Sequence, residues 1–297
     1  MKTYLDCIPC LIRQGLDSAR AVTDDPAVHE RVLREVCRAA VKMDMRQSAP
    51  VMAQHIHRLV RDLSGVVDPY RQIKERFTQL ALGVYPYLES CVAEAADAMK
   101  TAVQLAIAGN VIDLGVNGSL DDAQVHRAID RALTVPLRGY LPSFTEAVSG
   151  AESILYLADN AGEIVFDRLL IEQVGPAKVT LAVRGAPVIN DATADDARAA
   201  GLNECVEIID NGSDAPGTIL GDCSDAFRRH FDQADLIIAK GQGNYETLSE
   251  VEADIFFVLM AKCPIIARDL GCEVGDFILS GSACAATAGR QDSRARI

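Results

Sequence analysis

The chain has 297 residues, of which 49% are hydrophobic and 24% are charged, and its formal net charge at pH 7 is −13. A chain of this size and composition forms one large globular domain or two modest ones. This acidity excludes the basic surface by which proteins bind nucleic acid or anionic membranes. Aromatic residues make up 5% of the chain and include no Trp, so few side chains are available to stack on bases or sugars.

The first half of the chain, residues 1–149, predicts only helices. Asp25 precedes Pro26 in the pattern of a helix cap and first turn, and apolar residues follow at helical spacing. Ser48 and Gly65 mark the start and the end of the next helix by the same reasoning. Further helices are expected from Asp68 onward, over residues 87–108, over residues 121–135 and after Ser143.

The second half alternates short apolar runs with polar, helix-like segments. The runs cover residues 154–158, 179–183, 206–209, 236–239 and 256–260, with one more expected at 264–267. Strands that alternate with helices indicate βαβ units and a mostly parallel sheet with helices on both faces. We therefore expect an α/β protein with a three-layer α/β/α domain over residues 150–282, preceded by an all-helical domain over residues 1–149 and followed by a disordered tail over 283–297.

Polar loops follow four of the predicted strands. In an open parallel sheet, ligands bind beyond the carboxyl ends of the strands. Turn chemistry alone explains one loop rich in Gly, Asn and Asp, but four such loops at one edge indicate a binding site. The loops cover residues 159–163, 184–191, 210–218 and 240–246.

Candidate metal ligands follow the first two of these strands. Asp159, Asn160 and Asp191 offer two carboxylates and one amide oxygen, which suit Mg²⁺ or Mn²⁺ and leave positions for water and a substrate phosphate. His is too scarce, at five residues, to favour a His-rich zinc hydrolase site. Lys240 directly follows a buried strand and is expected to hold a phosphate oxygen, while Gly243 would let backbone N–H groups approach an anion.

Six stretches in chain order are similar to the prokaryotic branch of the damage-control phosphatase family, which is also called acidic-residue methyltransferase-like. They are residues 6–11, 108–113, 159–163, 184–185 with 190–191, 212–217 and 240–246. Each stretch is modest alone, but six in this order are specific. The resemblance runs from residue 1 to about residue 281, and the remaining residues show no family pattern.

The resemblance implies hydrolysis of small phosphate esters, such as sugar phosphates or damaged phosphometabolites, by a three-layer α/β/α domain with a helical region packed on it. It implies a divalent metal (Mg, Mn, Co or Ni) on Asp159, Asn160 and Asp191, which together with Lys240 form the expected catalytic set. The expected substrate and phosphate contacts lie in the same loops and in residues 110–113. They are Asn110, Asp113, Glu163, Arg184, Asn190, Ser213, Asp214, Gly243 and Asn244.

Several roles have more than one interpretation. Glu163 or Asp214 is the hypothesised proton carrier. Asn110 and Asp113 fit an ordinary helix stop as well as a substrate contact. Two other function classes compete with the phosphatase: an S-adenosylmethionine-dependent carboxyl methyltransferase and a non-enzymatic metal- or metabolite-binding protein. A methyltransferase would not need hard metal ligands, and it would usually want a Gly-rich nucleotide loop after the first strand.

The pair Cys7-x-x-Cys10 has two interpretations. With Cys263 it could belong to a structural metal site or a redox pair, or the pair could simply be two small residues at a helix start. Because residues 1–7 lack the long apolar core of a signal peptide, we expect a cytoplasmic protein with reduced thiols. The expected partner is a small phosphorylated metabolite, with no nucleic acid and no membrane, and the sequence does not fix the oligomeric state.

Overall fold

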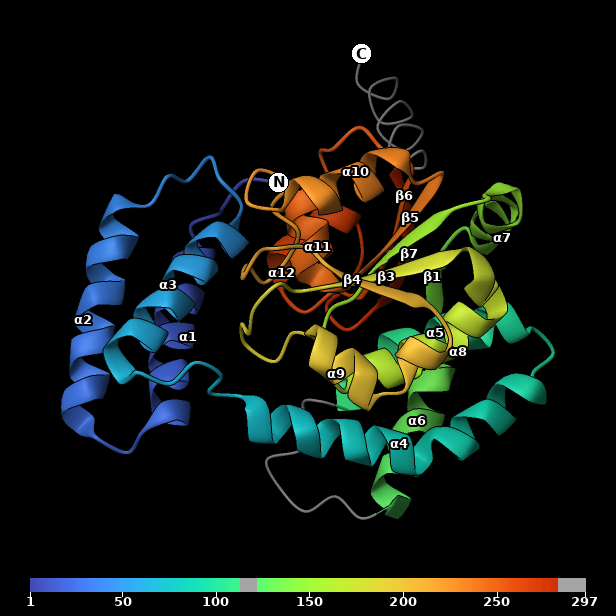
Figure 1. Ribbon diagram of the computed structural model, residues 1–297, viewed down its shortest axis with the longest axis horizontal. Coiled ribbons are helices and arrows are strands. Elements are labelled where there is room, and N and C mark those ends of the chain that lie inside the picture. The colour runs from blue at the N-terminus through green and yellow to red at the C-terminus, as the bar shows by residue number, and fades with distance from the viewer. Residues whose placement is uncertain (113–121, 283–297) are drawn as a thin grey trace.

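The computed structural model of the chain describes residues 1–112 and 122–282, with side chains over 1–109 and 125–282. Figure 1 shows a group of three helices beside a larger body in which helices cover both faces of a sheet. None of the helices in these ranges combines the length and the apolar character needed to span a membrane. The predicted three-layer α/β/α architecture is confirmed.

The three-helix group has a hydrophobic core of its own. It consists of α1 (Cys7–Val22), α2 (Pro26–Lys42) and α3 (Ala49–Ser64). Asp25 caps α2 by accepting a hydrogen bond from the backbone N–H of Ala27, and Gly65 ends α3 in the left-handed conformation that favours glycine. Val32 and Ile56 lie in the core between these helices, and both are fully buried.

A seven-stranded sheet forms the middle of the body, in the order β1-β7-β6-β5-β2-β3-β4. The strands are β1 (Leu137–Gly139), β2 (Ile154–Leu157), β3 (Val179–Val183), β4 (Glu207–Asp210), β5 (Leu236–Lys240), β6 (Ile255–Met260) and β7 (Phe277–Gly281). Strands β6, β5, β2, β3 and β4 are parallel, whereas β7 runs antiparallel to β6 and parallel to β1. The carboxyl ends of the five parallel strands therefore meet at one edge.

Helices cover both faces of this sheet. One face packs against α4 (Arg71–Ala93), α5 (Ala98–Ile112), α6 (Asp122–Thr134), α7 (Leu141–Gly150), α8 (Glu163–Val174) and α9 (Ala194–Ala199), and the other against α10 (Asp225–Gln233), α11 (Gly241–Leu248) and α12 (Pro264–Leu270). Short 3₁₀ turns lie at Pro176–Lys178 and Leu202–Glu204. In β2, Tyr156 faces the first layer and Leu155 the second, as the period of two in a strand requires.

The first half of the chain is not entirely helical, which corrects one expectation. Leu137–Gly139 forms β1 and pairs with β7. Gly139 has a φ of 125°, and a Cβ atom there would lie 1.8 Å from the carbonyl oxygen of Leu279, so only glycine allows this approach. A strand of three residues is too short to show a periodic pattern, which is why it was not expected.

The expected strand at residues 264–267 is also wrong. Pro264 starts α12, where proline suits the first helical turn because its missing N–H has no partner there in any case. Ile265, Ile266 and Ala267 are all buried in this short helix. A short apolar run does not distinguish a strand from a buried helical turn, and here the proline decides it.

The hydrophobic packing groups the elements differently from the expected ranges. Buried residues of α4, α5 and α7, such as Leu88, Leu105 and Phe144, share one core with the sheet. Within the described residues, α1–α3 pack around a separate core. The boundary between residues 149 and 150 stays a prediction, and the expected tail at 283–297 lies outside the described residues.

Candidate active site

Two loops at the carboxyl edge of the sheet pair with each other and bring the candidate metal ligands together. Asn160, after β2, and Asp191, after β3, form an isolated antiparallel bridge. The N–H of Ala192 donates to the carbonyl oxygen of Asp159 over 2.8 Å, and the N–H of Ala161 donates to that of Asn190 over 2.9 Å. Backbone pairing, rather than side-chain contact alone, therefore fixes the position of the three candidate ligands.

The second loop is strained beside these ligands. Ile189 has a φ of 45°, and it is the one non-glycine residue with a positive φ in the described ranges. A β-branched residue in this region costs on the order of 1–3 kcal/mol, and such strain persists where the surrounding structure holds it. Here the neighbouring backbone pairing holds it, and Ile189 lines the cavity described next.

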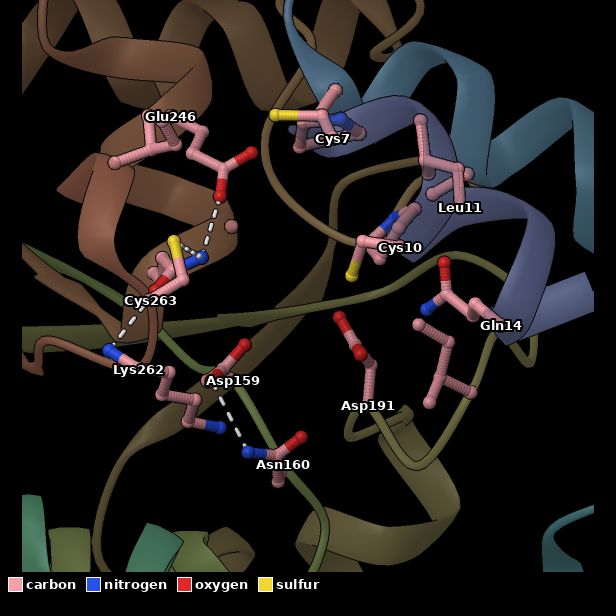
Figure 2. A pocket seen from close by; sticks show the side chains of 18 of the residues that line it. Cys7, Cys10, Leu11, Gln14, Asp159, Asn160, Asp191, Glu246, Lys262 and Cys263 are labelled. Carbon is pink, nitrogen blue, oxygen red and sulfur yellow. Dashed lines mark hydrogen bonds between the residues drawn. The ribbon is translucent and has the colours of Figure 1, made fainter. Parts of the chain in front are cut away.

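A cavity of about 570 Å³ lies between this sheet edge and the three-helix group. Asp159, Asn160, Asn190, Asp191 and Gly243 line it from the sheet side. The opposite lining comes from α1 and α3 and is largely apolar, and Figure 2 shows Leu11, Cys10 and Gln14 of α1 facing the two aspartates. The cavity thus has a charged floor on the sheet and an apolar roof on the helices.

The floor carries two desolvated carboxylates. Asp159 is 9% exposed and Asp191 3% exposed. Burial and the charge of Asp159 raise the pKa of Asp191 to about 7, against the opposing charge of Arg184. Arg184 donates from Nε to Asp191 over 2.7 Å, and its Nη2 lies 3.9 Å from Asp159. A divalent cation would stabilise the ionised form of this pair.

The oxygen donors of this site suit Mg²⁺ or Mn²⁺, and they do not form a closed cage of several carboxylates or thiolates. No group of three or more His, Cys, Asp and Glu side chains among the described residues is arranged to hold a metal ion. Two carboxylates and one amide oxygen match a hard cation that keeps several waters and takes further oxygens from a substrate phosphate. The site would therefore hold its metal through Asp159, Asn160 and Asp191, with open positions toward the cavity.

The amide of Asn160 has a defined orientation. Its Nδ2 donates to Asp159 Oδ2 over 3.1 Å and to Glu163 Oε2 over 2.9 Å. Both carboxyl oxygens accept from the NH₂ end of the amide, which is its donor end. The carbonyl oxygen of Asn160 is consequently the atom available to a cation.

Lys240 and Glu163 lie behind the floor and are almost fully buried, at 0% and 2% exposed. Lys240 Nζ donates to Glu163 Oε1 over 2.5 Å, to Asp167 Oδ1 over 2.6 Å and to the carbonyl oxygen of Ala106 over 2.8 Å. These three bonds use all the donors of an ammonium group. Contact between Lys240 and a phosphate stays a prediction, and it would require the amine to leave one of these partners.

Asn244 and Arg184 belong to the framework beneath the floor. Asn244 Nδ2 donates to the carbonyl oxygens of Lys240 and Ala158, over 2.7 Å and 3.2 Å. Its Oδ1 accepts from Thr218 over 2.8 Å and from Arg184 Nη1 over 3.3 Å. Their contact with substrate stays a prediction, but these bonds show how β5 and the loop after β3 are tied together.

Ser213 and Asp214 lie in the loop after β4. Ser213 donates to Asp222 Oδ2 over 2.5 Å. Asp214 accepts hydrogen bonds from Arg58, Gln54 and Arg61 of α3. Burial acts to raise the pKa of Asp214, but the hydrogen bonds from Arg58 and Gln54 outweigh it and bring that pKa to about 2.

The placement of Asp214 bears on its expected role. It is ionised at neutral pH and joins the roof to the body, which is a poor starting point for a proton carrier. Two predicted contacts remain. Asn110 lies in α5, but its side chain is not among those that the structure describes, and Asp113 lies outside the described residues.

Lys262 is a site residue that the sequence interpretation missed. It follows β6 at the same sheet edge and lines the cavity, and Figure 2 shows its side chain extending toward Asp159 and Asn160. Its charge acts on Asp191, although burial is the largest effect on that pKa. The sequence holds the clue, since Lys262 follows the apolar run at 256–260 as Lys240 follows 236–239.

Three thiols also line this cavity. Cys7 and Cys10 begin α1, and Cys263 precedes α12. Burial raises the pKa values of Cys7 and Cys10, and the charge of Glu246 raises them further. Both thiols therefore stay protonated at neutral pH, and a metal or redox role for the three remains a prediction.

The fold and the site define a three-layer α/β/α protein with a hard-ligand cavity at the carboxyl edge of its sheet. A family profile described as the damage-control phosphatase ARMT1-like domain matches residues 3–278. The chain belongs to this family, which confirms the resemblance seen in the sequence motifs.

Similar proteins agree with this assignment. A damage-control phosphatase from Archaeoglobus fulgidus is 36% identical over 94% of this chain and 98% of its own length. A damage-control phosphatase from Pyrococcus horikoshii is 34% identical over 94% and 97%. The crystal structure of a DUF89 family protein from Pyrococcus horikoshii superposes with a TM-score of 0.88 at 31% identity, covering 95% of this chain and 99% of that one.

Proposed function

We propose that the protein is a metal-dependent phosphatase that hydrolyses small phosphate monoesters, with Mg²⁺, Mn²⁺, Co²⁺ or Ni²⁺ on Asp159, Asn160 and Asp191. The observation that carries the proposal is the desolvated pair of carboxylates beside an oriented amide oxygen on the floor of an open cavity. Two relatives named damage-control phosphatases support the reaction class. When bound, the metal supplies a Lewis acid that neutralises phosphate charge and activates water.

The protein's own side chains would bind and orient the ester. Lys262 would place a point charge on a phosphate oxygen at the floor, because its side chain extends toward Asp159 and Asn160. Arg184 would hold Asp191 in position through the 2.7 Å hydrogen bond from Nε. The result is a phosphate subsite on the sheet edge, with the rest of the substrate directed toward α1.

The cavity suits a small phosphorylated metabolite. Its volume of about 570 Å³ is in the usual range for small-molecule sites. Leu11, Ala53 and Ile265 give the upper lining apolar surface against which the carbon skeleton of an ester would pack. Sugar phosphates and damaged phosphometabolites are therefore the substrates to test first.

The loop after β2 does not favour the methyltransferase alternative. Its one glycine, Gly162, lies so close to α4 that a Cβ atom would meet Phe77 Cβ at 2.7 Å. This glycine serves helix packing rather than forming a cradle for a nucleotide, which would need several glycines at this turn.

The test is a metal add-back assay on chelator-stripped protein. Phosphate release from p-nitrophenyl phosphate and a sugar-phosphate panel would be measured with each of the four metals, for wild type, Asp159→Ala and Asp195→Ala. Asp195 is a matched control because its side chain is 96% exposed on α9. We expect turnover restored by metal in wild type and Asp195→Ala and lost in Asp159→Ala; no turnover with any metal would contradict the proposal.

A further inference from the structure

We propose that Glu163 is a positioning residue that, held by the buried Lys240, fixes the amide of Asn160 so that its carbonyl oxygen faces the metal site. This inference rests on the proposed function, because it concerns a ligand of the proposed metal. It gives Lys240 and Glu163 a role different from the phosphate contact and proton transfer expected from the sequence.

The amide of Asn160 takes its orientation from its partners. An Asn side chain has an oxygen end and an NH₂ end of nearly the same shape, so hydrogen bonds decide which way it faces. Glu163 Oε2 lies 2.9 Å from Asn160 Nδ2. A reversed amide would place two acceptor oxygens at that distance and turn the NH₂ group toward a cation. Asp159 also accepts from this amide, but it is itself a proposed metal ligand, so Glu163 is the partner that lies outside the metal site.

Glu163 in turn takes its orientation from Lys240. A buried carboxylate is costly unless it is paired and hydrogen-bonded. Lys240 supplies both, since its Nζ lies 2.5 Å from Glu163 Oε1 and is fully buried. Burial raises the pKa of Glu163 to about 8, although the charge of Lys240 lowers it. Its two oxygens nevertheless accept from Asn160 and Lys240, and a proton on either oxygen would displace one of these donors.

Lys240 is anchored to the scaffold. Its other two bonds reach Asp167, one turn beyond Glu163 on α8, and the carbonyl oxygen of Ala106 in α5. Gly109 lets α5 approach α8 closely, because a Cβ atom there would lie 3.2 Å from Glu163 Cα. The chain of contacts from α5 through Lys240 and Glu163 to Asn160 thus ties a metal ligand to two packed helices.

Glu163 and Lys240 lack access to the cavity, so neither contacts a substrate or a metal directly. Asp159 and Asn160 belong to the lining of the 570 Å³ cavity, whereas Glu163 and Lys240 do not. Both Glu163 oxygens already have partners. A residue in this position acts on the reaction through the ligand it orients, as outer-shell partners of metal ligands generally do.

The test measures metal affinity without substrate. The dissociation constant for Mn²⁺ would be determined by calorimetry on the full-length apoprotein for wild type, Glu163→Gln, Glu163→Asp and the control Glu172→Gln. Glutamine keeps the shape but has one acceptor for two donors, and aspartate keeps the charge but is too short to reach both Lys240 and Asn160. Glu172 is on the same helix but at the surface, paired with Arg168.

We expect both Glu163 variants to bind Mn²⁺ about 10- to 100-fold more weakly, the range found for outer-shell partners of metal ligands, with Glu172→Gln unchanged. At saturating Mn²⁺ the variants should recover most of the wild-type kcat and keep its pH profile, which a lost proton carrier would not allow. Wild-type Mn²⁺ affinity in a folded Glu163 variant would overturn the inference alone. A wild-type chain that binds no Mn²⁺ would overturn the proposed metal site as well.

Discussion

Two clusters of charged side chains lie on either side of the loop after β2. The front cluster faces the cavity and consists of Asp159, Asp191, Arg184 and Lys262; the back cluster is sealed between α5, α8 and β5 and consists of Glu163, Asp167 and Lys240. Each contains two carboxylates and a lysine at or just beyond the carboxyl end of a strand. The difference is access: Lys240 has three protein partners and no exposure, whereas Lys262 lines the cavity. Similar residues at the same sheet edge thus serve different purposes.

Removing the back lysine should cost the most stability. Lys240→Met would leave Glu163 and Asp167 buried without their counter-charge, and breaking a buried ion pair in this way costs about 3–5 kcal/mol. Urea denaturation would measure the free energy of unfolding, with Lys262→Met as the matched control that stays near wild type. Equal losses in the two variants would erase the distinction between the clusters.

Removing the front lysine should mainly affect catalysis. Lys262→Met takes away the charge that we assign to the phosphate, and losing one such electrostatic contact costs about 10²- to 10³-fold in kcat. Metal-dependent hydrolysis of p-nitrophenyl phosphate would measure it. The Mn²⁺ dissociation constant should change little, because the amine is not a metal ligand. Unchanged turnover would remove Lys262 from the site.

The contact between roof and body gives a smaller, pH-dependent effect. The pKa of Asp214 is about 2 in the folded protein. Because it lies below the ordinary value of 3.8, its stabilisation is present above about pH 4 and is lost as pH falls toward 2. A pKa difference of this size contributes on the order of 2 kcal/mol.

Asp214→Asn tests this contact. The free energy of unfolding should depend less steeply on pH between about 4 and 2 in this variant than in wild type, while the exposed Asp195→Asn keeps the wild-type slope. Parallel slopes in all three proteins would show that the contacts of Asp214 with α3 add no stability.

The sequence predicts what depends on local pattern. Alternating apolar runs indicated the layers, and the carboxyl-edge rule brought Asp159, Asn160 and Asp191 together. The sequence did not predict the burial of Lys240. Its partner Ala106 lies 134 positions away in the chain and is brought close only by the packing of α5. Short elements were also missed: β1 has three residues, and α12 was mistaken for a strand because its apolar run is short.

The predicted site was incomplete for a similar reason. Lys262 follows β6 as the expected residues follow other strands, but Cys263 was the one residue of this loop that was included among the candidates. The cavity roof on α1 and α3 depends on how the three-helix group rests on the body, through contacts such as Arg58 with Asp214. No periodic pattern in the sequence encodes a contact across 156 positions.

The position of the metal tests the proposed site most directly. Crystals grown with Mn²⁺ would be measured for anomalous scattering at the manganese edge. We expect one strong peak among the side-chain oxygens of Asp159, Asn160 and Asp191, on the floor of the cavity. A peak at the thiols of Cys7, Cys10 and Cys263, with none at the floor, would contradict the proposed metal site.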